Sequence, residues 1–222
     1  MSIHAHGLTR IYDIGTVQVV GLDDIDLTVP TGHLVVLKGE SGSGKSTLLS
    51  LLAGLDRLTA GELTVAGHDL NRCSEAELTE FRRNTVGVIF QAFNLLPTLS
   101  VLENVCLPAL LAGRTYPAVR PRAEHLLAWL GLDDRRNHQP HQLSGGEMQR
   151  TAIARALIND PAIILADEPT GNLDSGNADR VMALLADLNQ QFNRTVVVAT
   201  HSDLADTHAT MMLRLQDGRI VS

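Results

Sequence analysis

The sequence predicts an α/β fold, in which an N-terminal antiparallel layer and a helical insert are added to a core of buried strands and helices. Two observations carry this prediction. Short apolar runs such as Leu34–Leu37 and Ala162–Ala166 have the length and composition of strands buried on both faces. Residues 100–158 are instead rich in helix formers. With 222 residues, of which 44% are apolar, the chain can bury the core of one domain with a subdomain.

The N-terminal antiparallel layer is predicted from strand-like segments around the first buried strand. Residues 3–9 and 17–29 are expected to be two of its strands, with Tyr12 between them. Gly61–Gly67 adds a strand that is closed by a glycine. Near the other end of the chain, Asp217-Gly218 lies between two strand-like runs and is typical of a tight hairpin.

Helices are predicted where capping residues precede a suitable run or where apolar residues recur at helical spacing. Ser74 and Glu77 form a capping box, which opens a short helix to about Arg83. Two later helices are indicated by apolar residues at i, i+3, i+4 and i+7. These residues are Ala123, Leu126, Leu127 and Leu130 in the first helix and Val181, Leu184, Leu185 and Leu188 in the second.

The helical residues divide the predicted domain. We expect a helical subdomain at about residues 92–158, inserted between residues 1–91 and 159–222, which form the core of a single domain. Gly131 suits the end of a helix inside this insert.

A glycine-rich loop follows the strand predicted at 34–37. Residues 39–46 match the pattern G-x-x-x-x-G-K-[ST] at every fixed position. Glycines allow backbone N–H groups to turn inward around an anion, and the helix expected at 46–53 points its positive end at the same place. Lys45 adds a cation for phosphate oxygens, and the Ser46 hydroxyl is a hard oxygen suited to Mg²⁺. The residues assigned to the nucleotide are Gly39, Ser41, Gly42, Ser43, Gly44, Lys45, Ser46 and Thr47.

The alternative for this loop is a chance glycine-rich turn. A match to the pattern is expected in roughly one chain in a hundred of this size. Because the loop also lies between a strand and a helix in the required order, we interpret it as a phosphate-binding loop.

Two carboxylates, Asp167 and Glu168, end the buried strand predicted at 162–166. Ligands of open α/β sheets bind at such strand ends, where a carboxylate can hold Mg²⁺ and its neighbour can polarise a water. The alternative is a helix N-cap pair before Pro169. Together with the upstream loop, the pair predicts a nucleotide site with a metal and a base.

A second glycine-containing segment, Ser144-Gly145-Gly146-Glu147, precedes a run of helix formers. A serine and two glycines at a helix start can bind an anion. An ordinary capping box formed by Ser144 and Glu147 explains the same residues. The residues alone leave both interpretations open.

Composition excludes several classes of protein. The net charge of −7, the pI of about 5.7 and the absence of a dense basic stripe argue against a nucleic-acid partner. No apolar run approaches the ~18 residues that span a bilayer. The N-terminal residues lack the regions of a signal peptide, and Cys73 and Cys106 form no motif and suggest a reducing cytosol.

Leu143-Ser-Gly-Gly-Glu-Met-Gln-Arg150 resembles the signature of ATP-binding-cassette (ABC) ATPases, and the other motifs of that family follow in order. Tyr12 lies where the family has an adenine-stacking aromatic, and Gln91 matches its glutamine loop. Gly171–Asp174 matches the loop after the acidic pair, and His201 matches the switch histidine. The resemblance covers residues 3–220.

This resemblance implies a cassette that consists of a phosphate-loop NTPase core, an N-terminal antiparallel β layer and an inserted helical subdomain. It implies ATP and Mg²⁺ as ligands and a second copy of the chain as a head-to-tail partner, whose signature segment closes over the ATP. The implied catalytic residues are Glu168, His201 and Lys45. The implied metal ligands are Ser46, Gln91 and Asp167. Further nucleotide contacts are implied for Tyr12, Gln91, Ser144, Gly145, Gly146, Glu147 and Asp174.

Two further segments resemble one branch of the ABC ATPases. Leu165–Asp174 and Phe90–Asn104 look like the lipoprotein-releasing and macrolide-efflux branch, which also contains the cell-division cassette. Members work with an integral membrane permease of few spans and a large extracytoplasmic domain, so the chain is expected at the cytoplasmic face of the inner membrane. A division-type regulator is an alternative, and an importer ATPase is a weaker one. A groove for the permease is expected around Leu95–Val105, and the alternative is that these apolar residues simply pack the helical subdomain.

Overall fold

The computed structural model describes residues 1–221, and its centre is a six-stranded sheet. The strand order is β10-β9-β3-β8-β7-β6, and all pairs are parallel except the antiparallel pair β9–β10. The strands are β3 (Leu34–Lys38), β6 (Val86–Ile89), β7 (Ile163–Asp167), β8 (Thr195–Ala199), β9 (Met211–Gln216) and β10 (Arg219–Ile220). The buried strands and the terminal hairpin predicted from the sequence are confirmed.

Each face of this sheet supports a separate hydrophobic core, because alternate residues of a strand point to opposite faces. In β3, Leu34 and Val36 belong to one core, whereas Val35 and Leu37 belong to the other. The central strands are fully covered, which explains why their sequences are continuous apolar runs rather than alternating ones.

The second sheet is the antiparallel layer, with strand order β2-β1-β4-β5. Its strands are β1 (Ile3–Ile14), β2 (Val17–Val29), β4 (Ala60–Val65) and β5 (His68–Asp69). The placement of Tyr12 between two strands was wrong, since Tyr12 pairs with Val19 inside the β1–β2 ladder. The ladder extends to Ile14 and Val17 because Gly15, at φ 63°, makes the tight turn that joins them.

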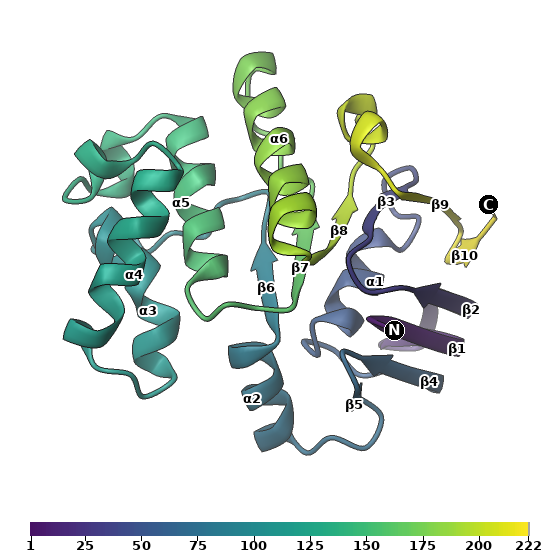
Figure 1. Ribbon diagram of the computed structural model, residues 1–222. Helices are drawn as coiled ribbons and strands as arrows, with labels where there is room; N and C mark the ends of the chain where they lie inside the picture. The colour runs from purple at the N-terminus through teal and green to yellow at the C-terminus, as the bar shows by residue number, and fades with distance from the viewer. Residues whose placement is uncertain (222) are drawn as a thin grey trace.

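The helices lie on both sides of the six-stranded sheet. Helices α1 (Lys45–Leu52) and α2 (Glu75–Asn84) pack in the core shared with the antiparallel layer. Helix α6 (Ser175–Phe192) packs in the other core. Figure 1 shows α3, α4 and α5 grouped on the side of the molecule opposite the antiparallel strands.

These three helices are α3 (Val101–Leu111), α4 (Tyr116–Trp129) and α5 (Gly145–Leu157), and short 3-10 turns are the other helical elements between α4 and α5. Their apolar residues are continuous with one face of the six-stranded sheet, so this core joins the helical insert to the strands. The Ser74–Glu77 capping box is confirmed. A second one, Ser100–Glu103, begins α3 and was not predicted.

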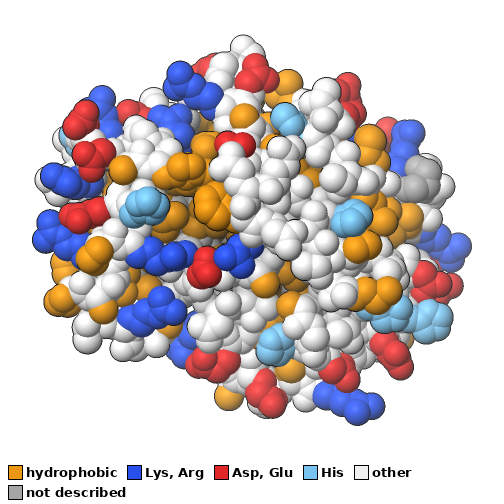
Figure 2. All heavy atoms as spheres, viewed as in Figure 1, with side chains coloured by type: hydrophobic (Ala, Val, Ile, Leu, Met, Phe, Trp, Pro, Cys, Tyr) orange, Lys and Arg blue, Asp and Glu red, His pale blue; other side chains and the backbone are white. Residues whose placement is uncertain are grey.

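The surface carries charges of both signs. On the face drawn in Figure 2, acidic and basic side chains are interspersed over the helical part of the molecule. Within residues 1–221, no helix has the length and apolar character needed to cross a bilayer.

Candidate nucleotide site

A cavity of about 750 Å³ lies where the parallel strands of the large sheet end. The loop after β3 contributes residues 40–42 and 44, the start of α1 contributes residues 45–47, and β7 contributes Asp167 with its neighbour Glu168. Gln91 lies two residues after β6, and His201 lies two residues after β8. The carboxyl ends of parallel strands share one edge of a sheet, and this is why residues far apart in the sequence line one space.

The predicted phosphate loop is held by its own lysine. Lys45 is only 8% exposed, and its ammonium group donates hydrogen bonds to the carbonyl oxygens of Gly39 (2.8 Å) and Glu40 (2.9 Å). Gly44 has φ 105° and lies so close to Gly21 that a Cβ would be 2.5 Å from its carbonyl oxygen, so glycine is required there. The loop therefore places a cation and the start of α1 at one wall of the cavity.

Asp167 fits the predicted role of a metal ligand. Within the described residues 1–221, its Oδ1 atom is buried and has no hydrogen-bond partner. Asp167 lines the same cavity as Ser46 and Gln91, so one carboxylate and two neutral oxygen donors surround one space. Hard oxygen donors of this kind suit Mg²⁺, and the fit rests on the unpaired buried carboxylate oxygen.

Glu168 is held in a fixed orientation by two side chains. Its Oε2 atom accepts a hydrogen bond from Thr200 Oγ1 at 3.1 Å, and its Oε1 atom lies 3.0 Å from His201 Nδ1. The backbone of Glu168 has φ 44°, an uncommon conformation for a residue other than glycine. Its N–H group donates to Ala199 O at 2.8 Å, which ties it to β8. The sequence predicted Glu168 and His201, whereas Thr200 carried no local signal.

Gln91 meets the loop that follows the acidic pair. Its carbonyl oxygen accepts a hydrogen bond from Asn172 Nδ2 at 2.9 Å. A Cβ on Gly171 would lie 2.8 Å from Gln91 Nε2, so glycine is what lets the two loops approach. The Gln91 side chain is exposed and lines the cavity, and its contact with a metal and a nucleotide stays a prediction.

The antiparallel layer supplies the outer wall of the cavity. Tyr12 lines it together with Val19, Val20 and Gly21 from β2, and its stacking on a base stays a prediction. The exposed valines were missed, because an apolar residue on the outer face of a strand has no pattern that separates it from any other surface valine. An aromatic ring beside two valines can bind the flat face of a base.

Two predicted loop residues lie behind the cavity. Ser43 is only 5% exposed, and Gly39 packs against Ser43 Oγ and the Leu215 carbonyl. They shape the loop, while the cavity is lined by the other six predicted residues of this segment, which are Ser41, Gly42, Gly44, Lys45, Ser46 and Thr47.

The signature segment lies outside this cavity. Ser144 is exposed and caps α5, with its Oγ atom accepting from Glu147 N at 3.3 Å and Glu147 Oε2 accepting from Ser144 N at 2.8 Å. The ordinary capping box is therefore present. It leaves the exposed Ser144 and half-buried Gly145 at a helix N-terminus, so it does not exclude an anion contact made by a different chain.

The Glu147 carboxylate is strongly stabilised. Hydrogen bonds from the Ser144 backbone and from Arg135, whose Nε lies 2.9 Å from Glu147 Oε1, lower the pKa of Glu147 from 4.5 to about 2. A depressed pKa means that the native state binds the proton more weakly than the unfolded state. The contribution to stability is therefore present above pH 4.5 and is lost as the pH falls towards 2.

We expect Glu147→Gln to lower the free energy of unfolding by about 2 kcal/mol at pH 7, and this difference should shrink towards zero as the pH approaches 2. Urea unfolding of both proteins across this pH range measures it. Glu62→Gln, at an exposed position on β4, is the matched control. A difference that stays constant down to the acid end would contradict the assigned cause.

Asp174 also lies outside the cavity. It caps α6, with Oδ1 accepting from Asn177 N at 2.9 Å and Oδ2 accepting from Asn177 Nδ2 at 2.6 Å. These hydrogen bonds lower the pKa of the exposed Asp174 carboxyl. A nucleotide contact by Asp174 stays a prediction, and it needs a nucleotide bound by another subunit.

Comparison with known proteins agrees with this arrangement. A family model described as ABC transporter matches residues 22–171. The lipoprotein-releasing system ATP-binding protein LolD of Chromohalobacter salexigens is 44% identical over 218 residues, which cover 98% of this chain and 92% of that protein. The macrolide export ATP-binding/permease protein MacB of Rhodopseudomonas palustris is 46% identical over 221 residues, which cover 100% of this chain and 34% of that protein. The chain thus spans about a third of the length of the MacB relative.

Solved structures agree as well. The dimeric structure of a post-hydrolysis state of the ATP-binding cassette MJ0796 bound to ADP and Pi matches with a TM-score of 0.92 and 39% identity, covering 99% of this chain and 97% of that chain. A second dimeric structure of MJ0796, described as a bacterial ABC transporter cassette, also matches with a TM-score of 0.92, at 41% identity.

Proposed function

The chain belongs to the ABC transporter family as an ATP-hydrolysing cassette, and from this premise we propose that it drives a separate membrane permease of the lipoprotein-release or macrolide-efflux type. The observation that carries the enzymatic part is the single cavity that unites the phosphate loop, Asp167, Glu168 and His201. The relatives LolD and MacB support the branch by their names and by identities near 45% over almost the whole chain.

In this proposal Glu168 accepts the proton of the attacking water, and His201 holds the terminal phosphate and that water. The 3.0 Å contact between His201 Nδ1 and Glu168 Oε1 supports the assignment, because it places both groups at one end of the cavity. Lys45 neutralises phosphate charge from the loop. Ser46, Gln91 and Asp167 would hold Mg²⁺, which supplies further positive charge against the phosphates when bound.

The proposal includes a head-to-tail dimer. An ATP molecule carries more negative charge than one lysine and one Mg²⁺ neutralise, and the N-terminus of α5 presents N–H groups and a positive helix end. Ser144 lies outside the same chain's cavity and is exposed, so a second copy is the source that fits. The dimeric MJ0796 structures support this arrangement.

A groove between α2, β6, α3 and α5 is the proposed binding site for the permease. It has a volume of about 470 Å³ and is lined by apolar residues, including Phe90, Pro108 and Leu111, and by Arg82, Arg83 and Arg155. We expected the groove around Leu95–Val105. We propose the neighbouring groove because Val101, Leu102 and Val105 are buried in the core of the helical insert, as the alternative of simple packing expected.

Arg155 connects this groove to the nucleotide cavity. Its guanidinium donates hydrogen bonds to the carbonyl oxygens of Phe93 (2.8 Å) and Asn94. Phe93 and Asn94 both have positive φ, which is strained for residues other than glycine. The Arg155 guanidinium therefore stabilises a strained segment that extends from Gln91 to Asn94. A peptide that enters the groove would thus press on the loop carrying a cavity residue and on α5, the signature helix.

We infer from this placement that the chain works at the cytoplasmic face of the inner membrane through its permease. A division-type regulator that transmits force without transport uses the same contacts, and an importer ATPase is a weaker alternative. The permease partner distinguishes the importer, since its span number differs from that of the lipoprotein-release and macrolide-efflux branch.

The experiment is co-purification with permeases encoded beside this chain's gene. We expect a permease of four spans to co-purify with the wild type, and Leu111→Asp to reduce its recovery by roughly tenfold or more, because a charge would be buried in the apolar groove. Basal ATP hydrolysis should not change, as Leu111 is 64% exposed and lies outside the nucleotide cavity. Val221→Asp, at a position 54% exposed, is the control.

Recovery of a six-span permease with a periplasmic binding protein would replace the proposal by an importer. Equal recovery of the four-span permease with Leu111→Asp and with wild type would show that the groove is not its seat.

A further inference from the structure

Tyr12 is held by two charged side chains that come from different parts of the chain. Its hydroxyl group donates a hydrogen bond to Asp56 Oδ2 at 2.9 Å. The Arg10 guanidinium lies over the Tyr12 ring, with Cζ 4.3 Å from the ring centroid. Arg10 also pairs with the same carboxylate, with Nε 2.9 Å from Asp56 Oδ2 and Nη2 2.8 Å from Asp56 Oδ1. We call Arg10, Tyr12 and Asp56 the tyrosine triad.

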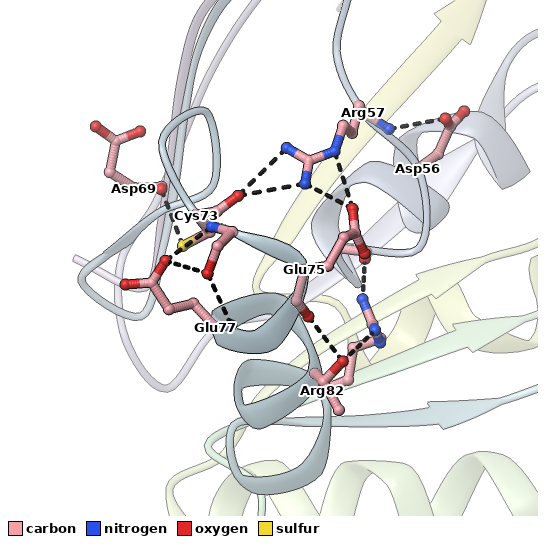
Figure 3. Close-up of polar contacts among 10 residues, drawn as sticks. Asp56, Arg57, Asp69, Cys73, Glu75, Glu77 and Arg82 are labelled. Carbon is pink, nitrogen blue, oxygen red and sulfur yellow. Dashed lines mark hydrogen bonds and ion pairs between the residues drawn. The ribbon is translucent and has the colours of Figure 1, made fainter.

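The Asp56 carboxylate is itself fixed in place. The N–H group of Arg57 donates to Asp56 Oδ1 at 2.7 Å. Figure 3 shows the Arg57 side chain reaching from this loop to the start of α2, where Nη2 lies 2.6 Å from Glu75 Oε1 and 3.3 Å from the Cys73 carbonyl oxygen. The loop between α1 and β4 is therefore anchored at its centre, directly beside Asp56.

The ring of Tyr12 is confined on three sides. Arg10 covers one face, Asp56 holds the hydroxyl, and Gly21 lies so close that a Cβ there would be 2.8 Å from Tyr12 Cε2. Tyr12 is the member of the triad that lines the nucleotide cavity. The ring face opposite Arg10 is therefore the one available to a base.

We propose that Arg10 and Asp56 are positioning residues that fix the Tyr12 ring for stacking on the base of the bound nucleotide. The inference rests on the proposed role of Tyr12 and extends it to two residues that do not contact the nucleotide. Arg10 and Asp56 are each 23% exposed in their side chains, so the pair that holds the ring is largely shielded from water.

The physical benefit is preorganisation. A tyrosine on the outer face of a strand has rotamer freedom, and ordering it on binding costs affinity. The triad removes that freedom before the nucleotide arrives. The phosphate loop leads into the first turn of α1, and Asp56 lies just after the last turn. Helix α1 therefore links the part of the site that binds phosphate to the part that would bind the base.

The test compares binding of ATP with binding of inorganic tripolyphosphate, which has no base, by isothermal titration calorimetry. We expect Asp56→Ala to weaken ATP roughly fivefold to twentyfold and to leave tripolyphosphate unchanged. Tyr12→Phe, which removes only the hydroxyl, should cause a similar loss for ATP. The double variant should lose no more than either single variant, because both break one interaction.

The control is Asp26→Asn, which removes the charge of an exposed carboxylate in the same layer, paired with His6 at 2.7 Å. Equal losses for ATP and tripolyphosphate in Asp56→Ala would indicate general damage to the loop and overturn the proposal. Unchanged ATP affinity in both Asp56→Ala and Tyr12→Phe, together with a loss in Tyr12→Ala, would overturn it while base stacking stands. Unchanged ATP affinity in Tyr12→Ala would refute the role of Tyr12 itself.

Discussion

Replacing Glu168 with Gln is expected to slow steady-state ATP hydrolysis by roughly 10²–10⁴-fold, the usual contribution of a positioned base, while ATP binding stays intact. The amide keeps the size and an oxygen acceptor, so Thr200, whose Oγ1 lies 3.1 Å from Glu168 Oε2, can still donate to it. What is lost is the ability to take a proton from water. With hydrolysis blocked, ATP-bound closed dimers should accumulate.

Three measurements check this expectation: phosphate release, ATP affinity and the oligomeric state with and without ATP. Glu62→Gln is the control, because it makes the same chemical change at an exposed position on β4. Steady-state hydrolysis at the wild-type rate in Glu168→Gln would show that Glu168 is not the base, even if closed dimers accumulate.

The nucleotide site was predictable largely because its parts are local. The phosphate loop is eight consecutive residues, and the acidic pair directly follows a recognisable buried strand. That these parts meet follows from a general property of parallel sheets, whose carboxyl ends share an edge. The structure adds the contacts that fix them, such as the hydrogen bond from Thr200 to Glu168 and those from Lys45 to two carbonyl oxygens.

The parts that sequence reasoning missed depend on contacts between distant residues. Arg10 and Tyr12 meet Asp56 across more than forty positions, and a single aspartate before an arginine has no periodicity that would single it out. The proposed groove differs from the expected one for a related reason. The apolar residues at 101–105 do have helical spacing, but spacing alone does not say whether a face is buried by its own chain or left for a partner.

The signature segment shows how one local pattern is compatible with two roles. The Ser144–Glu147 capping box stabilises α5 within one chain, as the capping-box interpretation predicted. It also orients the helix N-terminus towards the surface, with Ser144 exposed. The exposed N-terminus is the end that the proposed dimer uses.

Mixing two inactive variants is expected to restore ATP hydrolysis if the sites are shared between subunits. Lys45→Ala should weaken nucleotide binding by roughly 10²-fold, because it removes the charge that meets the phosphates. Gly145→Asp should abolish hydrolysis by repelling phosphate from the signature segment. The variant should fold, since a Cβ at Gly145 would lie 3.5 Å from its nearest neighbour, Leu173 Cδ2, and an acid at a helix start is favourable.

A heterodimer of the two variants contains one site with both changes and one with neither, because each site takes its phosphate loop from one subunit and its signature from the other. Random mixing should therefore recover about a quarter of the wild-type hydrolysis rate if the two sites act independently. Gly145→Ala, which adds a methyl group without charge, is the control for crowding at this position. Should the mixture stay inactive while mixed dimers form in the presence of ATP, each subunit would be completing its own site, and the head-to-tail dimer would have to be abandoned.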